Sequence, residues 1–155
     1  MIFDEAFYRK MATQKWRQQD YKKAAEYYEK VLELSPKDFD IQQHYAQCLV
    51  KLNIGKKAER LFYENIVKDF HVAESFYELS QLNIELNEPN KAFLFGINYV
   101  ILSEDKDFRE MLEKTFEVAY TNEQKIELEA QLFSTQLLFQ FLFSQGRLEE
   151  ARTYI

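Results

Sequence analysis

The sequence predicts an all-α protein built from repeated pairs of helices. Its 155 residues contain only three glycines and two prolines, too few for the tight turns of a many-stranded β-sandwich or barrel. Small residues also recur at one fixed spacing, as expected where neighbouring helices approach closely in a helical repeat. Two columns show the same 34-residue spacing: Ala12, Ala46 and Ser80, and Ala24, Ala58 and Ala92.

Signals for helix ends divide the chain into its expected elements. Asp20, Asn53 and Asn87 occupy short corners between paired helices, and Pro89 stands in a first turn, where its missing N–H costs nothing. Thr121, with Gln124 three residues later, is a capping box that opens a long helix. We therefore expect helices at about residues 3–18, 21–34, 38–52, 55–69, 72–86, 89–102, 106–119, 122–145 and 147–155.

These helices group into three 34-residue repeats, at about residues 5–38, 39–72 and 73–106. Residues 107–155 are expected to add further helices with a partial fourth repeat. Gly146 and Ala151 match a helix-turn-helix corner there, but Ala151 lies well over one repeat length beyond Ala92, so this last repeat is out of register. We predict one helical-repeat domain over residues 1–155.

The repeat resembles the tetratricopeptide repeat family, whose pattern is W-x2-L-G-x2-Y, then A-x3-F, then P over about 34 residues. The second and third units depart from the pattern at Gln42, Phe70 and Gly96. The residues that carry the resemblance are Tyr8, Met11, Ala12, Ala24, Tyr28 and Pro36 in the first unit, Tyr45, Ala46, Leu49, Ala58 and Phe62 in the second, and Phe76, Leu79, Ser80 and Ala92 in the third. The resemblance implies a right-handed superhelix, an α–α solenoid.

Proteins of this architecture bind partners in a concave groove made by the first helix of each pair. The rings of Trp16, His44 and Tyr77 among polar groups are typical of binding hot spots. The side chains expected to line this groove are Arg9, Lys10, Thr13, Trp16 and Arg17 in the first repeat, Gln43, His44, Gln47 and Lys51 in the second, and Glu74, Tyr77, Glu78, Gln81 and Glu85 in the third.

Charge is distributed unevenly along the chain. The net charge of −6 divides into +1 for residues 1–38, +1 for 39–72, −4 for 73–106 and −4 for 107–155. The expected groove therefore runs from basic to acidic, which predicts that an extended ligand binds in one direction. The overall acidity argues against nucleic acid as a partner, because backbone phosphates require a contiguous basic face.

Composition and cysteine content predict a cytoplasmic protein. Apolar residues make up 46% of the chain and charged residues 30%, which is typical of a folded, soluble domain. The longest apolar stretch, residues 137–143, is far shorter than the ~20 residues that span a bilayer. A lone Cys48 forms no internal disulfide, and the acidic start of the chain is unlike a secretory signal.

Catalytic and metal chemistry are not expected. His44 and Cys48 lie four residues apart on one helix and could reach one ion, but two candidate ligands are too few. Pairs such as Glu74 and Glu78 are typical of an exposed helix face. The sequence contains no P-loop, nucleophile elbow, HExxH motif or dinucleotide fingerprint. We therefore predict a non-catalytic, cofactor-free scaffold or adaptor that binds a protein or peptide.

Two alternatives remain open. The chain is also similar to small three-repeat secretion chaperones, which hold an extended segment of a client, and an apolar pocket in the groove would favour that function. A metal-binding or regulatory domain of an enzyme is the less favoured alternative.

The C-terminal part predicts a further contact. The long helix expected at 122–145 is apolar on nearly every side toward its end and needs cover on more than one face. Phe133, Leu137 and Phe141 are the residues expected to make this contact. We expect either that the chain is a fragment of a longer repeat protein or that two copies form a symmetric homodimer through these helices.

Overall fold

The computed structural model describes residues 3–119, and every regular element in that range is an α-helix. These helices confirm the predicted all-α fold, and their ends lie within three residues of the expected ends. They are α1 (Glu5–Arg17), α2 (Tyr21–Leu34), α3 (Phe39–Lys51), α4 (Gly55–Val67), α5 (Val72–Glu85), α6 (Pro89–Ser103) and α7 (Lys106–Ala119). The helices expected at 122–145 and 147–155, the Thr121 capping box, and the predicted contact residues Phe133, Leu137 and Phe141 lie outside the described residues.

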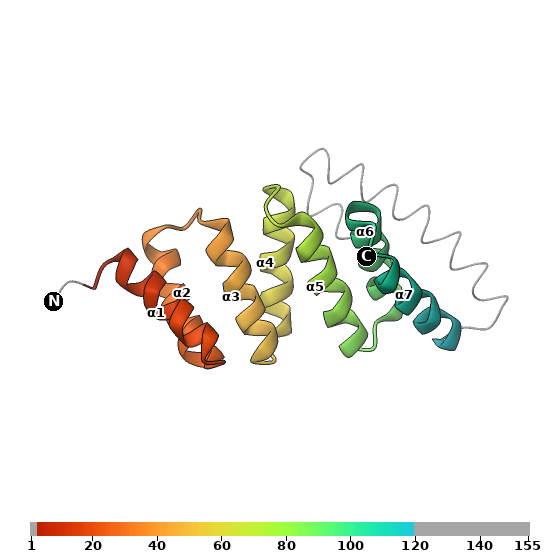
Figure 1. The fold of residues 1–155 in the computed structure, drawn as a ribbon, viewed down its shortest axis with the longest axis horizontal. Helices are drawn as coiled ribbons and strands as arrows, with labels where there is room; N and C mark the ends of the chain where they lie inside the picture. Colours follow the sequence, from red (N-terminus) through yellow and green to blue (C-terminus); the bar gives the residue numbers. More distant parts are fainter. Residues whose placement is uncertain (1–2, 120–155) are drawn as a thin grey trace. The chain divides into compact units, whose positions relative to one another are not determined.

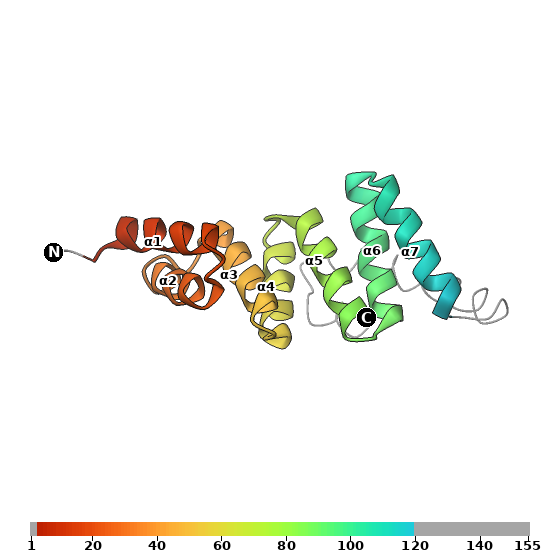
Figure 2. The ribbon, with the colours of Figure 1, turned by 60° about the horizontal axis from the view of Figure 1, so that its bottom comes forward.

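The helices belong to two compact units, Met1–His71 and Val72–Ile155, which are described separately. In the first unit, α1 packs against α2, α2 against α3, and α3 against α4 (Figure 1). In the second unit, α5 packs against α6 and α6 against α7 (Figure 2). The boundary between the units falls at the predicted end of the second repeat, whereas the expectation of one domain stays a prediction.

The columns of small residues lie where helices cross. Ala12, Ala46 and Ser80 are fully buried on α1, α3 and α5, and the second column is equally buried on the partner helices, at Ala24 on α2, Ala58 on α4 and Ala92 on α6. A side chain no larger than a methyl or hydroxymethyl group allows the two helices of a pair to pack closely at these points. The constant spacing of the two columns therefore records helix crossings.

Aspartates precede four of the described helices. The carboxylates of Asp4, Asp20, Asp38 and Asp105 precede α1, α2, α3 and α7, and each accepts a hydrogen bond from a backbone N–H three residues later, at 2.9, 3.2, 3.1 and 3.0 Å. Such caps satisfy N–H groups that have no partner within the helix. Asp20, expected in a corner, is thus the capping residue of α2.

The corner that ends the first helix of each pair repeats in backbone conformation as well. Gln19, Asn53 and Asn87 share the spacing of the small-residue columns and adopt left-handed conformations, with φ of 60°, 61° and 56°. Asparagine tolerates this conformation better than most residues, and glycine adopts it without steric cost. Gln19 is therefore the least suited of the three side chains to its backbone.

Replacing Gln19 with glycine is expected to raise the free energy of unfolding by about 0.5–1 kcal/mol, because the left-handed conformation no longer opposes a Cβ atom. Urea denaturation of the purified chain measures the change. The matched control is Asn53→Gly, for which a smaller gain is expected. If Gln19→Gly lowers the free energy of unfolding while Asn53→Gly leaves it unchanged, Gln19 does not adopt the left-handed conformation.

The two departures from the family pattern that lie inside helices are packed by different means. Gln42, on α3, is buried and donates a hydrogen bond to Asn65 Oδ1 on α4 at 3.0 Å. The Asn65 amide in turn donates to the Phe39 carbonyl at 3.1 Å. Gly96, on α6, leaves room for Leu112 of α7, since a Cβ atom there would lie 2.3 Å from Leu112 Cδ1. At Gln42, a hydrogen-bonded network with Asn65 takes the place of the aromatic side chain of the family pattern. At Gly96, the side chain of Leu112 from α7 takes that place.

Candidate binding surface on helix α1

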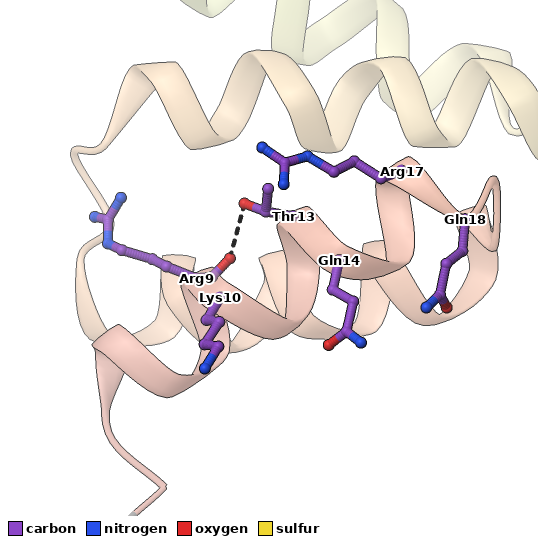
Figure 3. A pocket seen from close by; sticks show the side chains of 6 residues that line it. All are labelled: Arg9, Lys10, Thr13, Gln14, Arg17 and Gln18. Atoms are coloured by element: carbon purple, nitrogen blue, oxygen red, sulfur yellow. Dashed lines mark hydrogen bonds between the residues drawn. The ribbon is translucent and has the colours of Figure 1, made fainter.

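A hollow of about 590 Å³ lies along the exposed side of α1. Figure 3 shows Lys10, Gln14 and Gln18 pointing to one side of the helix, and Thr13 and Arg17 to the other. All six lining side chains are polar or cationic: Arg9, Lys10, Thr13, Gln14, Arg17 and Gln18. Side chains four residues apart on a helix form one ridge. The hollow follows two neighbouring ridges, one with Arg9, Thr13 and Arg17 and one with Lys10, Gln14 and Gln18. Four of the five groove residues predicted in the first repeat line it.

Arg9 is held by partners within the chain. Its Nε donates to Glu5 Oε1 at 2.9 Å, its Nη2 to the same oxygen at 2.6 Å, and Nη2 also donates to Asp38 Oδ2. Asp38 is the capping residue of α3, so the guanidinium ties α1 to the start of α3. Arg9 therefore lines the hollow, as expected, but its charge is paired with two carboxylates of the chain.

The ion pairs shift the pKa values of both carboxyls downward. The pKa of Glu5 lies below its ordinary 4.5, chiefly because Arg9 donates to it. Burial alone would raise the pKa of Asp38, but the hydrogen bonds from Arg9 and the Ile41 N–H outweigh burial and hold that pKa below 3.8. The same bonds raise the pKa of Arg9. All three groups are therefore charged at neutral pH.

Arg9→Met is expected to lower the free energy of unfolding at pH 7 by up to about 1 kcal/mol, the range of partly exposed ion pairs. Carboxyls with lowered folded-state pKa values stabilise the fold above their unfolded values of 4.5 and 3.8 and lose that contribution as pH falls through the folded values. The difference between wild type and Arg9→Met should therefore vanish in that acid range, as measured by urea denaturation at a series of pH values. Lys10→Met is the control. A difference independent of pH would show that only the packing of the arginine stem matters.

Lys10 and Arg17 differ from Arg9 in their surroundings. Both are exposed, and within residues 3–119 neither forms an ion pair. Thr13, between them, donates its hydroxyl to the Arg9 carbonyl at 3.0 Å. The hollow thus offers two cations whose charges are open to a ligand.

The structure brings together two of the predicted aromatic groove residues. The rings of Trp16 on α1 and His44 on α3 lie 6.1 Å apart, edge to face. Trp16 also packs against Tyr21 at 5.3 Å, and His44 against Tyr28 at 6.0 Å. His44 is exposed, and its Nδ1 lies 2.9 Å from the Asp40 carbonyl oxygen. The ring faces therefore contribute to the packing of α1 against α2 and α3 while the outer edge of His44 reaches solvent.

The remaining candidates of the second repeat divide between core and surface. Gln43 is only 3% exposed, and its Oε1 accepts a hydrogen bond from Asn65 Nδ2 at 2.8 Å. It therefore faces α4 and joins the Gln42–Asn65 network, and it does not line an open groove as expected. Gln47 is half-buried, and Lys51 is exposed at the end of α3.

The candidates of the third repeat lie on α5, in the second unit. Glu74 and Glu85 are exposed, and Glu78 and Gln81 are half-buried. The ring of Tyr77 packs at 5.1 Å from Tyr99 of α6 and 5.2 Å from Phe108 of α7. The Tyr77 side chain is therefore half-buried, and its ring contributes to the packing of α5 against α6 and α7.

Two lining residues, Gln14 and Gln18, were not among the sequence candidates. The sequence does indicate where they lie, since both follow Lys10 at steps of four residues along the same face of α1. Hydrophobic periodicity identified only the buried face, and a polar glutamine carries no mark that separates a lining position from any other exposed one.

A second hollow, of about 630 Å³, lies at the turn between α2 and α3. Phe39 and Phe70 line part of it with rings 5.2 Å apart, and Phe70 is 42% exposed. Next to it, His71 Nε2 pairs with Asp40 Oδ1. Phe70 stands where the repeat pattern has proline, so an exposed aromatic ring takes the place of a turn residue.

Cys48 lies in the core of the first unit. Its side chain is fully buried, and burial raises the pKa of its thiol to about 12. Within residues 3–119, no group of three or more His, Cys, Asp or Glu side chains is placed to hold a metal ion.

Helix pairs repeated at a constant interval, with a polar hollow on the first helix, define an all-α helical-repeat protein. Residues 15–62, from the end of α1 into α4, match the family model described as Tetratricopeptide repeat. This match confirms, over residues 15–62, the resemblance to tetratricopeptide repeats seen in the sequence.

The fold is also similar to a solved structure described as the crystal structure of MamA protein. The match has a TM-score of 0.62 and 19% sequence identity, and it covers 97% of this chain and 87% of that one. At this identity the likeness shows the fold. Comparison with curated proteins finds no match. No helix within residues 3–119 is long and apolar enough to cross a membrane.

Proposed function

We propose that this protein is a non-catalytic scaffold that binds a segment of a partner protein on the exposed face of α1. The observation that carries the proposal is the hollow of about 590 Å³, whose lining consists entirely of polar and cationic side chains. His44 and Lys51, exposed on α3 of the same unit, extend the candidate surface beyond α1.

The proposal distinguishes residues that contact the partner from residues that stabilise the surface of α1. Lys10, Gln14 and Arg17 are exposed or line the hollow, and they are expected to touch the partner. Arg9 is expected to act indirectly, because its guanidinium joins Glu5 to Asp38. Glu74 and Glu85, exposed on α5 of the second unit, are candidates for a separate partner contact on that unit.

Site-specific photocrosslinking in a lysate of the cells that produce the protein tests the proposal. A photoreactive phenylalanine analogue at Gln14 is expected to give a small number of discrete protein adducts that excess unlabelled protein suppresses. The matched control places the same group at Glu26, which is exposed on α2 outside the hollow. Identical adducts at both positions, or none at Gln14, would contradict a partner site on α1.

A further inference from the structure

The hollow at the turn between α2 and α3 combines aromatic and charged side chains. It measures about 630 Å³, and residues 35–40 and Phe70 line it. The ring of Phe70 lies 5.2 Å from the ring of Phe39, with a tilt of 35° between their planes, and Phe70 is 42% exposed. A ring that is held by a second ring and is open to solvent offers a ready contact surface to a ligand.

A carboxylate is held beside these rings by the same two chain segments. Phe39 contacts Phe70, and the next residue in each segment continues the contact, since His71 Nε2 pairs with Asp40 Oδ1. The start of α3 and the turn after α4 are therefore joined by two successive contacts. As a result, the carboxylate of Asp40 and the ring of Phe70 line one hollow.

The charged side chains of this hollow differ in how far their charges are compensated. Asp38 is fully engaged, because Oδ1 caps α3 and Oδ2 accepts from Arg9. The Asp40 side chain is 66% exposed, and its Oδ2 forms no hydrogen bond among the described residues. Lys37 is exposed and forms no ion pair in the same part of the chain. One carboxylate oxygen of Asp40 is thus open to a ligand.

An aromatic face next to a carboxylate favours a cationic ligand. The face of a phenyl ring carries the negative part of its quadrupole, which attracts cations. A guanidinium is planar, so it can stack on a ring and donate hydrogen bonds to a carboxylate from its edge. An ammonium is a compact, strongly hydrated charge without a flat face. Arginine is therefore the side chain whose chemistry matches Phe70 and Asp40 together.

We propose that this hollow is a second interaction site, which binds an arginine side chain of a partner protein with the guanidinium stacked on Phe70 and paired with Asp40. The site goes beyond the proposed function, because it uses no residue that lines the hollow on α1, and each site can be disproved without the other. Lys37 restricts the ligand, since its ammonium repels further cations. The site therefore takes a single arginine and not a run of basic residues.

The test titrates the ¹⁵N-labelled full chain with three twelve-residue Gly-Ser peptides, each capped at both ends and carrying one central arginine, lysine or glutamine. At millimolar concentration, the arginine peptide should shift the backbone amide signals of residues 37–40 and 70–71. The lysine peptide should bind more weakly, and the glutamine peptide should leave these signals unchanged.

Point variants separate the ring from the charges. Phe70→Leu removes the ring but keeps an apolar side chain, and should weaken binding of the arginine peptide about two- to fivefold, the range of an exposed cation–π contact. Asp40→Asn should weaken it by up to about fivefold. Lys37→Gln should strengthen it, because a like charge is removed. The matched controls are Phe3→Leu, at a ring that is 54% exposed, and Asp107→Asn, at an exposed carboxylate on α7.

Several results would overturn the proposal. These are unshifted amide signals at the hollow, binding of the lysine or glutamine peptide as tight as that of the arginine peptide, and equal weakening by a control variant and its counterpart in the hollow. Weaker binding after Lys37→Gln would overturn it as well. If Phe70→Leu unfolds the chain, Asp40→Asn and Lys37→Gln decide the question, since both variants keep the two rings.

Discussion

Phe62→Ala is expected to lower the free energy of unfolding by about 3–5 kcal/mol, the cost of removing a buried phenyl ring and leaving a cavity. Phe62 is fully buried on α4, one turn after the equally buried Ala58. Loss of the ring leaves the helices around it without a contact that no neighbouring side chain can replace, because interiors are closely packed. Urea denaturation of the full chain, followed by circular dichroism, measures the change.

Phe3→Ala is the matched control, since it deletes the same ring at a position that is 54% exposed. We expect a change smaller than about 1 kcal/mol there. Similar losses at both positions would mean that Phe62 does not lie in the core of its unit.

Restoring the aromatic residue of the family pattern at Gly96 is expected to destabilise the second unit. A Cβ atom at this position would lie 2.3 Å from Leu112 Cδ1 and 2.9 Å from Ser80 Oγ. Ser80 cannot move freely, because its hydroxyl donates to the Ala92 carbonyl at 2.7 Å. Gly96→Phe should therefore cost about 3 kcal/mol, at the upper end of overpacking, as measured by the shift in the urea midpoint.

A double-mutant cycle distinguishes overpacking from a general intolerance of α6. Leu112→Ala alone should destabilise, because the side chain is buried on α7, but in the Gly96→Phe background it should recover part of the loss by making room for the ring. Additive losses would contradict the exchange of an aromatic side chain on α6 for a leucine on α7.

Much of the fold could be predicted because the relevant signals are local or periodic. Ala24, Ala58 and Ala92 mark crossings between helices adjacent in the chain, so their spacing survives in the sequence. Asp20 and Asn53 mark corners through the backbone hydrogen bonds and left-handed conformations that their side chains favour. The helices within residues 3–119 accordingly lie where they were expected.

The candidate site was predicted in part, and the differences share one cause. Arg9 was expected at the basic end of the groove, but Asp38, far from it in the sequence, accepts its hydrogen bond. Gln43 was expected in a groove, but Asn65 of α4 draws it into the core. Tyr77 was expected to face a ligand, and part of its ring packs against α6 and α7. Asp38, Asn65, Tyr99 and Phe108 all lie outside the helix that carries the candidate, and no periodic pattern encodes such pairs. Glu5, the other partner of Arg9, lies four residues before it on α1, so spacing alone could have indicated that ion pair.

By itself, the sequence determined the helices of this protein, their pairing at a constant repeat interval, and the positively charged face of α1, since these follow from spacing, capping residues and composition. Only the tertiary structure decided which of those charges remain available to a partner. Arg9, unlike Lys10 and Arg17, pairs with Glu5 one turn earlier on α1, and the path of the chain between α2 and α3 also brings the Asp38 carboxylate to its guanidinium. Electrostatic interactions act over distances in space, and those distances exist only once the helices have packed.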